Sequence, residues 1–198
     1  MELTGKRIGF ALTGSFCTYG DILPSIKALV INGADVTPIL SYNAANLDTR
    51  FIKSTDLKAY LTDVTGKDII DDLVKAEPIG PKKLLDLLII APCTGNTLAK
   101  LALGITDTPV LLAAKAHLRN QAPVLIAVST NDALAANAKN LGALLNTRHI
   151  YFVPYRQDDH KKKETSIVAD MNLIVDAAKS ALDGIQLQPV MLDPKSYQ

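Results

Sequence analysis

Hydrophobic positions along the chain fall either in short unbroken runs or in longer segments where apolar residues recur every three or four positions. Residues 84–91 form the clearest run, because their leucines and isoleucines do not alternate with polar residues, which is typical of a strand covered by helices on both faces. Helical spacing is clearest over 21–31, where Pro24 fits the first turn and Asn32-Gly33 supplies a stop. The pattern predicts strands over 7–12, 36–40, 84–91, 123–128 and 150–153, and helices over 21–31, after Ser54, around 67–75, and over 109–118, 133–145 and 165–182.

Strands and helices alternate throughout, which predicts an α/β fold with three layers: a doubly wound, mostly parallel sheet of Rossmann-like or flavodoxin-like type. Pro38 cannot donate to a central ladder, so its strand is expected at an edge or bulge. Residues 155–164 are expected as a charged surface loop. We expect residues 1–185 to form one domain and residues 186–198 to form a tail, or an arm docked on a neighbouring subunit.

Composition narrows the classes of function. The formal net charge is +1 and there is no Trp, so nothing favours nucleic acid or an anionic membrane as a partner. No apolar segment approaches the ~20 residues that span a bilayer, and a soluble cytoplasmic protein is expected. Cys17 and Cys93 lack metal-ligand spacing, so no metal site is predicted.

Polar side chains follow four successive predicted strands. The carboxyl ends of parallel strands meet at one edge of a sheet, so these groups should converge on a ligand. The alternative is that each only caps the helix that follows it. The residues are Thr13 and Ser15, then Ser41 and Asn43, then Thr94, Asn96 and Thr97, and finally Ser129, Thr130 and Asn131.

The first of these turns matches neither of two phosphate-binding fingerprints. Gly9-x4-Gly14 has the glycine spacing of a Walker A loop, but Ser15 stands where the lysine belongs. The dinucleotide pattern G-x-G-x-x-G is also absent. The turn either holds one phosphate of a mononucleotide with its backbone N–H groups and a hydroxyl, or is an ordinary structural turn.

Longer strings in the same turns resemble a known family. Thr13-Gly14-Ser15, and the stretch APCTGNT over 91–97 in place of a P-A-S-A-N-T motif, are similar to the homo-oligomeric flavin-containing cysteine decarboxylase group of flavoproteins. Within that group, GKRIGFALTGSFC, APCTGNT and AVSTNDAL most closely resemble the family of dipicolinate synthase B subunits. The resemblance runs over nearly the whole chain.

The resemblance implies an FMN site at the strand ends. It places Gly14, Ser15 and Ser41 near the phosphate, with Thr13 and Phe16 in the same turn. It places Ser129, Thr130 and Asn131 on the far side of the isoalloxazine. The residues that it places around the ribityl chain and the phosphate are Cys93, Thr94, Asn96 and Thr97.

The chain also departs from the decarboxylases. Residues 43–51 hold no counterpart of their catalytic histidine, and VSTNDAL over 128–134 replaces their P-x-M-N-x-x-M-W clamp motif. Catalytic residues therefore stay unknown. Arg50 matches a recurring family position and is a candidate for a substrate carboxylate, as are Lys115 and Arg119, which share a helix face; surface solvation or ion pairing is the alternative for all three.

Three further groups of side chains remain to be interpreted. Cys93 is either a packed thiol beside the cofactor or a reactive one. The three histidines, His117, His149 and His160, are expected at surfaces or helix ends. Residues 161–163, all lysine, are expected as a solvated face.

The implied function is that of an FMN-binding subunit of dipicolinate synthase. It would work with an NADPH-binding A subunit to convert dihydrodipicolinate, a small dicarboxylate, to dipicolinate during sporulation, in the cytoplasm of the mother cell. The resemblance also implies a homo-oligomer, a trimer or a dodecamer. Two alternatives stay open: a non-catalytic scaffold or activator with a vestigial flavin pocket, and a flavin-dependent cysteine decarboxylase.

Overall fold

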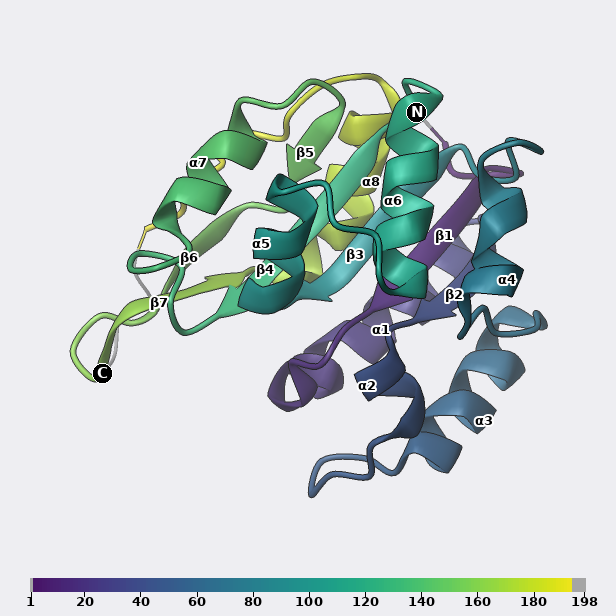
Figure 1. The fold of residues 1–198 in the computed structure, drawn as a ribbon, viewed down its shortest axis with the longest axis horizontal. Coiled ribbons are helices and arrows are strands. Elements are labelled where there is room, and N and C mark those ends of the chain that lie inside the picture. Colours follow the sequence, from purple (N-terminus) through teal and green to yellow (C-terminus); the bar gives the residue numbers. More distant parts are fainter. Residues whose placement is uncertain (1, 194–198) are drawn as a thin grey trace.

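A seven-stranded mixed sheet runs through the centre of the protein (Figure 1). The structure is a computed structural model that describes residues 2–193. Its strand order is β2-β1-β3-β4-β7-β6, and β5 also pairs with β4. The parallel strands are β1 (Arg7–Leu12), β2 (Asp35–Leu40), β3 (Leu87–Cys93), β4 (Val124–Thr130) and β5 (Ile150–Phe152), and the antiparallel pair is β6 (Tyr155–Asp159) and β7 (Lys163–Ala169).

Helices cover both faces of the sheet, which gives three layers (Figure 1). One face carries α1 (Tyr19–Ile31) and α8 (Ile174–Leu182), and the other carries α5 (Gly95–Ala102), α6 (Pro109–Arg119) and α7 (Ala138–Leu145). The helices α2 (Tyr42–Asn46), α3 (Ser54–Thr65) and α4 (Leu73–Ala76) lie between β2 and β3 in the chain. Short 3₁₀ turns occur at Phe16–Thr18, Glu77–Ile79 and Met171–Leu173.

The core is built on the two central strands, because every residue of β3 is buried and β4 is buried up to its last residue. Burying one such aliphatic side chain stabilises the fold by about 1.5–3 kcal/mol. Gly9 belongs to β1, where a Cβ atom would lie 2.5 Å from Cδ1 of Leu85. Glycine at position 9 therefore allows close packing in the core and is not part of a phosphate-binding loop.

The predicted fold class is confirmed, and Pro38 lies in β2, the outer strand of the parallel set. Within the sheet, Pro38 pairs with Phe10 of β1 on one side only. On the open side its carbonyl accepts from the N–H of Ile70 at 3.0 Å. An edge position thus accommodates the missing donor.

The predicted loop over 155–164 is wrong, and the predicted helix over 165–182 is correct only in its second half. The polypeptide instead forms the β6–β7 hairpin, and helix begins only at Ile174. Pairing decides this: Ser129 and Thr130 at the end of β4 pair with Val168 and Ile167. The change to helix follows Asp170, whose side chain accepts from the N–H of Asn172 at 3.3 Å.

Several predicted boundaries also shift. The third strand begins at Leu87 and continues to Cys93, so it includes nearly half of the APCTGNT stretch. Helix within 67–75 is limited to α4, because Ile70 bridges to Ile39 of β2. Helix within 133–145 begins at Ala138.

The segment 186–192, expected as a tail or arm, pairs with its own chain. The Gln186 side chain accepts from the N–H of Phe152 at 2.8 Å and donates to its carbonyl at 2.7 Å. The N–H of Tyr155 donates to the carbonyl of Val190, and the carbonyl of Tyr155 accepts from the N–H of Leu192. Residues 194–198 of the predicted tail lie outside the described residues.

Candidate functional site

The loops after β1 and β3 diverge at a topological switch point. Strand β1 pairs with β2 on one side and with β3 on the other, so the chain crosses to opposite sides of β1, and ligands of open α/β sheets bind at such a crevice. Thr13 ties the two loops together, because its Oγ1 donates to the carbonyl of Pro92 at 2.5 Å and accepts from the N–H of Thr94 at 3.1 Å. The hydroxyl of Thr13 is therefore committed to the frame of the crevice.

The larger of two cavities at this edge has a volume of about 630 Å³. It lies between the turn after β1, the end of β4 and the β6–β7 hairpin. Its lining residues are Gly14, Ser15, Cys17, Thr18, Asp21, Thr94, Gly95, Ser129, Thr130, Asn131, Asp158, Lys163, Ser166, Ile167 and Val168.

The second cavity, of about 350 Å³, adjoins the first, because Gly14 and Thr94 line both. Polar groups from the ends of β1, β2 and β3 and from the start of α6 surround it. Its lining residues are Thr13, Gly14, Ser41, Tyr42, Asn43, Thr94, Asn96, Thr97, Lys100, Asp107, Thr108 and Leu111.

Some of these hydroxyls cap helices and also line a cavity. Oγ1 of Thr94 accepts from the N–H of Thr97 at 3.2 Å, and Oγ of Ser41 accepts from the N–H of Ala44 at 3.3 Å. A capping oxygen keeps further hydrogen-bonding capacity. The two interpretations of these residues are therefore compatible.

The fourth loop is held against the first and the third. Oγ of Ser15 and Oγ of Ser129 lie 2.9 Å apart. Thr130 donates to Oδ1 of Asp132 at 2.6 Å, and Asn137 donates to Oδ2 of the same carboxylate at 2.7 Å. This network lies against Gly95, where a Cβ atom would be 2.5 Å from Oγ1 of Thr130.

A flavoprotein family model matches residues 1–182 of the sequence. The chain belongs to the flavoprotein family. It is 49% identical over 197 residues to the B subunit of dipicolinate synthase from Bacillus subtilis (strain 168), covering 100% of this chain and 98% of that protein.

Solved structures give the same relationship. The crystal structure of the dipicolinate synthase B subunit from Bacillus halodurans C has a TM-score of 0.90 at 45% identity, covering 98% of this flavoprotein and 99% of that chain. The FMN binding protein AtHal3 has a TM-score of 0.61 at 18% identity, covering 88% and 95% of the two chains. The second likeness shows the shared fold.

Most of the predicted cofactor residues of this flavoprotein line one or both cavities, and two do not. Cys93 is fully buried at the end of β3, and burial raises the pKa of its thiol far above the usual range. Phe16 packs on Tyr19, with 5.3 Å between ring centroids. Cys93 is thus a packed thiol, as one of the two interpretations held.

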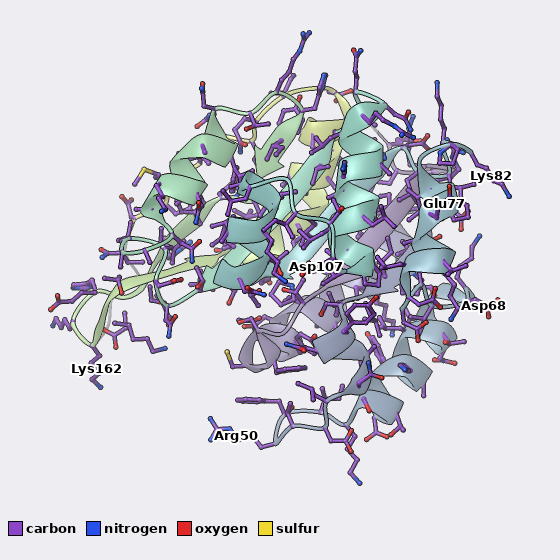
Figure 2. All side chains as sticks on the ribbon, in the orientation of Figure 1. Arg50, Asp68, Glu77, Lys82, Asp107 and Lys162 are labelled. Carbon is purple, nitrogen blue, oxygen red and sulfur yellow. The ribbon has the colours of Figure 1, made fainter. Side chains whose placement is uncertain are left out.

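The three candidate cations lie away from both cavities. Arg50 stacks over the ring of Phe51 at 4.8 Å and points outward from the loop after α2 (Figure 2). Lys115 and Arg119 are exposed on the second half of α6. It is the start of this helix, at Leu111, that lines the smaller cavity. Within this chain the structure does not bring these three side chains to the predicted ligand.

The histidines also lie away from the cavities. His117 is 2% exposed and its Nε2 has no hydrogen-bond partner. Of the two expected positions, a surface or a helix end, it occupies the helix end, in the last turn of α6. Burial lowers its pKa to about 4. Neither cavity is lined by a histidine among the residues that the structure describes.

Sequence reasoning missed the charged groups of the cavities. Lys100 pairs with Asp107 at 2.6 Å beside the smaller cavity, and Lys163 pairs with Asp158 at 2.5 Å beside the larger one. Asp158 raises the pKa of Lys163 through its hydrogen bond and its charge. Residues 163–169 do not alternate between exposed and buried positions, so the sequence carried no local signal for the strand that brings Lys163 back to the site.

Two features are absent from residues 2–193. No helix there is long and apolar enough to cross a membrane. No group of three or more His, Cys, Asp or Glu side chains is placed to hold a metal ion in the same range.

Proposed function

We propose that this flavoprotein is the FMN-binding subunit of dipicolinate synthase, acting with an NADPH-binding A subunit to convert dihydrodipicolinate to dipicolinate during sporulation. The proposal rests on one observation above all. Two adjoining cavities lined by hydroxyl and amide groups meet at the β1/β3 crevice, in a chain that is 49% identical to a dipicolinate synthase B subunit over its whole length.

The cavities fit a phosphorylated flavin in size and chemistry. The smaller one presents hydroxyl and amide groups of Ser41, Asn43 and Thr97 beside Lys100, a donor set suited to a phosphate. The larger has a volume within the range of small-molecule and cofactor sites. We infer that Gly14 and Thr94, which line both, flank the ribityl chain.

When bound, the flavin would supply an acceptor for a hydride equivalent from a dihydropyridine ring. Aromatisation of dihydrodipicolinate removes two electrons and two protons. The A subunit would take the electrons on its oxidised nicotinamide cofactor, forming NADPH. The task of this chain is then to hold the substrate ring in one orientation and to exclude water, because the transfer depends on how the reacting groups are placed.

A homo-oligomer, trimer or dodecamer, in the cytoplasm of the mother cell is part of the same proposal. Size-exclusion chromatography with light scattering measures the assembly. A monomer at micromolar concentration would contradict that part alone.

The decisive experiment is an absorption spectrum of the purified protein with and without added FMN, followed by anaerobic mixing with dihydrodipicolinate. We expect stoichiometric flavin that bleaches as dipicolinate forms. Flavin that stays oxidised while product forms in the presence of the A subunit would contradict direct redox chemistry. A colourless protein that cannot be reconstituted would instead indicate a scaffold with a vestigial pocket.

A cysteine decarboxylase is the less favoured function, because none of the described residues lining the cavities is a histidine. Release of carbon dioxide from a cysteine-containing peptide or pantothenoylcysteine would revive it.

A further inference from the structure

Lys163 is the one Lys or Arg side chain among the described residues that line the larger cavity. It is the first residue of β7 and faces Asp158 of β6, with Nζ and Oδ2 2.5 Å apart. A substrate with two carboxylates needs cationic or strong hydrogen-bond donors. Because Arg50, Lys115 and Arg119 lie elsewhere and Lys100 lines the smaller cavity, this lysine is the cation that the described residues offer at the larger one.

The hairpin that carries Lys163 is tied to the fourth ligand loop. Oγ1 of Thr165 donates to the carbonyl of Asn131 at 2.7 Å, and Oγ of Ser166 donates to the carbonyl of Thr130 at 3.2 Å. Leu134 donates its N–H to the carbonyl of Thr165 at 3.0 Å. A ligand lying on the Ser129–Asn131 loop is therefore next to the strand that begins with Lys163.

The ion pair between Lys163 and Asp158 is suited to exchange. The side chains are 57% and 35% exposed, and ion pairs at such positions contribute little to stability. Replacing Asp158 at the ammonium group by a substrate carboxylate therefore costs the protein little free energy. The side-chain amide of Asn131 lines the same cavity and can donate to the second carboxylate.

Charge in the larger cavity depends on this one lysine. Its lining contains the carboxylates of Asp21 and Asp158 against the ammonium of Lys163. Loss of the lysine leaves two carboxylates facing a dianionic substrate, whereas loss of the Asp158 charge leaves one of each sign. The two substitutions should therefore change binding of an anion in opposite directions.

We propose that Lys163 binds one carboxylate of the substrate and that Asp158 holds the ammonium group in place until the substrate displaces it. This inference rests on the proposed function, because it takes the dicarboxylate from it. It assigns substrate binding to the hairpin and not to α6 or to the loop after α2.

The test is calorimetric titration of the FMN-loaded full chain with pyridine-2,6-dicarboxylate in metal-free buffer. We expect Lys163→Met to weaken binding about tenfold or more, as loss of a charged hydrogen-bond partner does. We expect Asp158→Asn to tighten binding by about two- to fivefold, the range of an exposed pair. FMN affinity, measured separately by flavin fluorescence, should stay within about twofold in both variants.

Matched controls lie on the same hairpin turn. Lys161→Met and Lys162→Met remove the same charge from residues that do not line the cavity, and we expect no change in binding. The uncharged analogue pyridine-2,6-dimethanol should not distinguish Lys163→Met from the unmodified chain.

Equal weakening by Lys163→Met and Asp158→Asn would show that the pair only supports the hairpin and would overturn the inference. So would unchanged binding in Lys163→Met, or a chain that binds FMN but no dicarboxylate. Repeating the titration without FMN separates this inference from the flavin proposal. The same opposite effects in a chain that takes no flavin would retain the Lys163 site and contradict only the flavin role.

Discussion

The hydroxyl oxygens of Ser15 and Ser129 lie 2.9 Å apart, although 114 positions separate the two residues in the sequence. This contact joins the turn after β1 to the end of β4 and places both hydroxyls at the larger cavity. It is the point at which the first and the fourth ligand loops meet directly.

The Ser15–Ser129 contact should couple the two loops. We expect Ser15→Ala and Ser129→Ala each to lower the free energy of unfolding by about 1 kcal/mol and to weaken FMN binding by roughly three- to tenfold, because each leaves the other hydroxyl without its partner. Urea unfolding and flavin fluorescence titration measure the two effects. The double variant should cost less than the sum of the singles; strictly additive losses would contradict the coupling. Ser180→Ala on α8, away from both cavities, serves as the control.

Gly95 should tolerate no side chain. A Cβ atom there would lie 2.5 Å from Oγ1 of Thr130 and 2.6 Å from Oδ1 of Asp132, so the network under α5 must move. We expect Gly95→Ala to destabilise the protein by about 1–3 kcal/mol and to weaken FMN binding. Thermal unfolding of the FMN-free chain and flavin titration measure the two effects.

The matched control for Gly95 is Gly142→Ala in α7, where a Cβ atom would meet nothing within 4 Å. It should be neutral or stabilise the protein by up to about 1 kcal/mol, since alanine is the better helix former. Equal losses in the two variants would refute the steric explanation.

The two cysteines should differ in reactivity. Cys17 is exposed and lines the larger cavity, whereas Cys93 is buried and burial raises the pKa of its thiol. We expect a thiol reagent to modify one cysteine per native chain and both after denaturation. Peptide mapping should locate the native label at Cys17, and FMN should slow its modification. Labelling of Cys93 in the native chain would contradict the buried position.

His117 should make stability depend on pH in mildly acidic solution. Burial lowers its pKa from 6.5 to about 4, while the carbonyl of Pro123 and the charge of Asp86 act in the opposite direction. Between these pH values the unfolded chain binds a proton that the folded chain does not. The free energy of unfolding should therefore fall as the pH drops from about 6.5 towards 4, by up to about 3 kcal/mol.

Urea unfolding at several pH values measures this slope, which His117→Gln should largely remove above a pH of about 4.5. The control His160→Gln, at an exposed position, should keep it. Carboxylates with lowered pKa values, such as Asp86, lose their contribution only at lower pH. An unchanged slope in His117→Gln would assign the acid sensitivity to another group.

The parallel half of the fold follows from local signals. Unbroken apolar runs indicate strands buried on both faces, and Pro38 indicates an edge. The rule that carboxyl ends of parallel strands share one edge is enough to bring Ser15, Ser41 and Thr94 to neighbouring positions. These residues do line the two cavities.

The hairpin could not be obtained in this way. Ile167, Val168, Met171 and Ile174 also fit helical spacing. The first two lie in a strand because they pair with β6 on one side and with Ser129 and Thr130 of β4 on the other. The pairing with β4 is a contact between segments far apart in the sequence, which local periodicity does not report. Without the hairpin, Lys163 was predicted on a solvated face. The candidate cations were then Arg50, Lys115 and Arg119.

Strand β4 changes its neighbour part-way along its length: Val124–Ile126 pair with β5, and Ser129 and Thr130 pair with β7. The hairpin is consequently anchored at its base, where Ile167 and Val168 pair with β4, and Lys163 lies beyond this anchored part, next to the turn. A change in the length of the hairpin turn would alter one wall of the larger cavity and so the ligands that it accepts. The paired base and the loop after β4 would stay the same. Ligand selectivity in proteins with this sheet can then evolve through the hairpin turn alone.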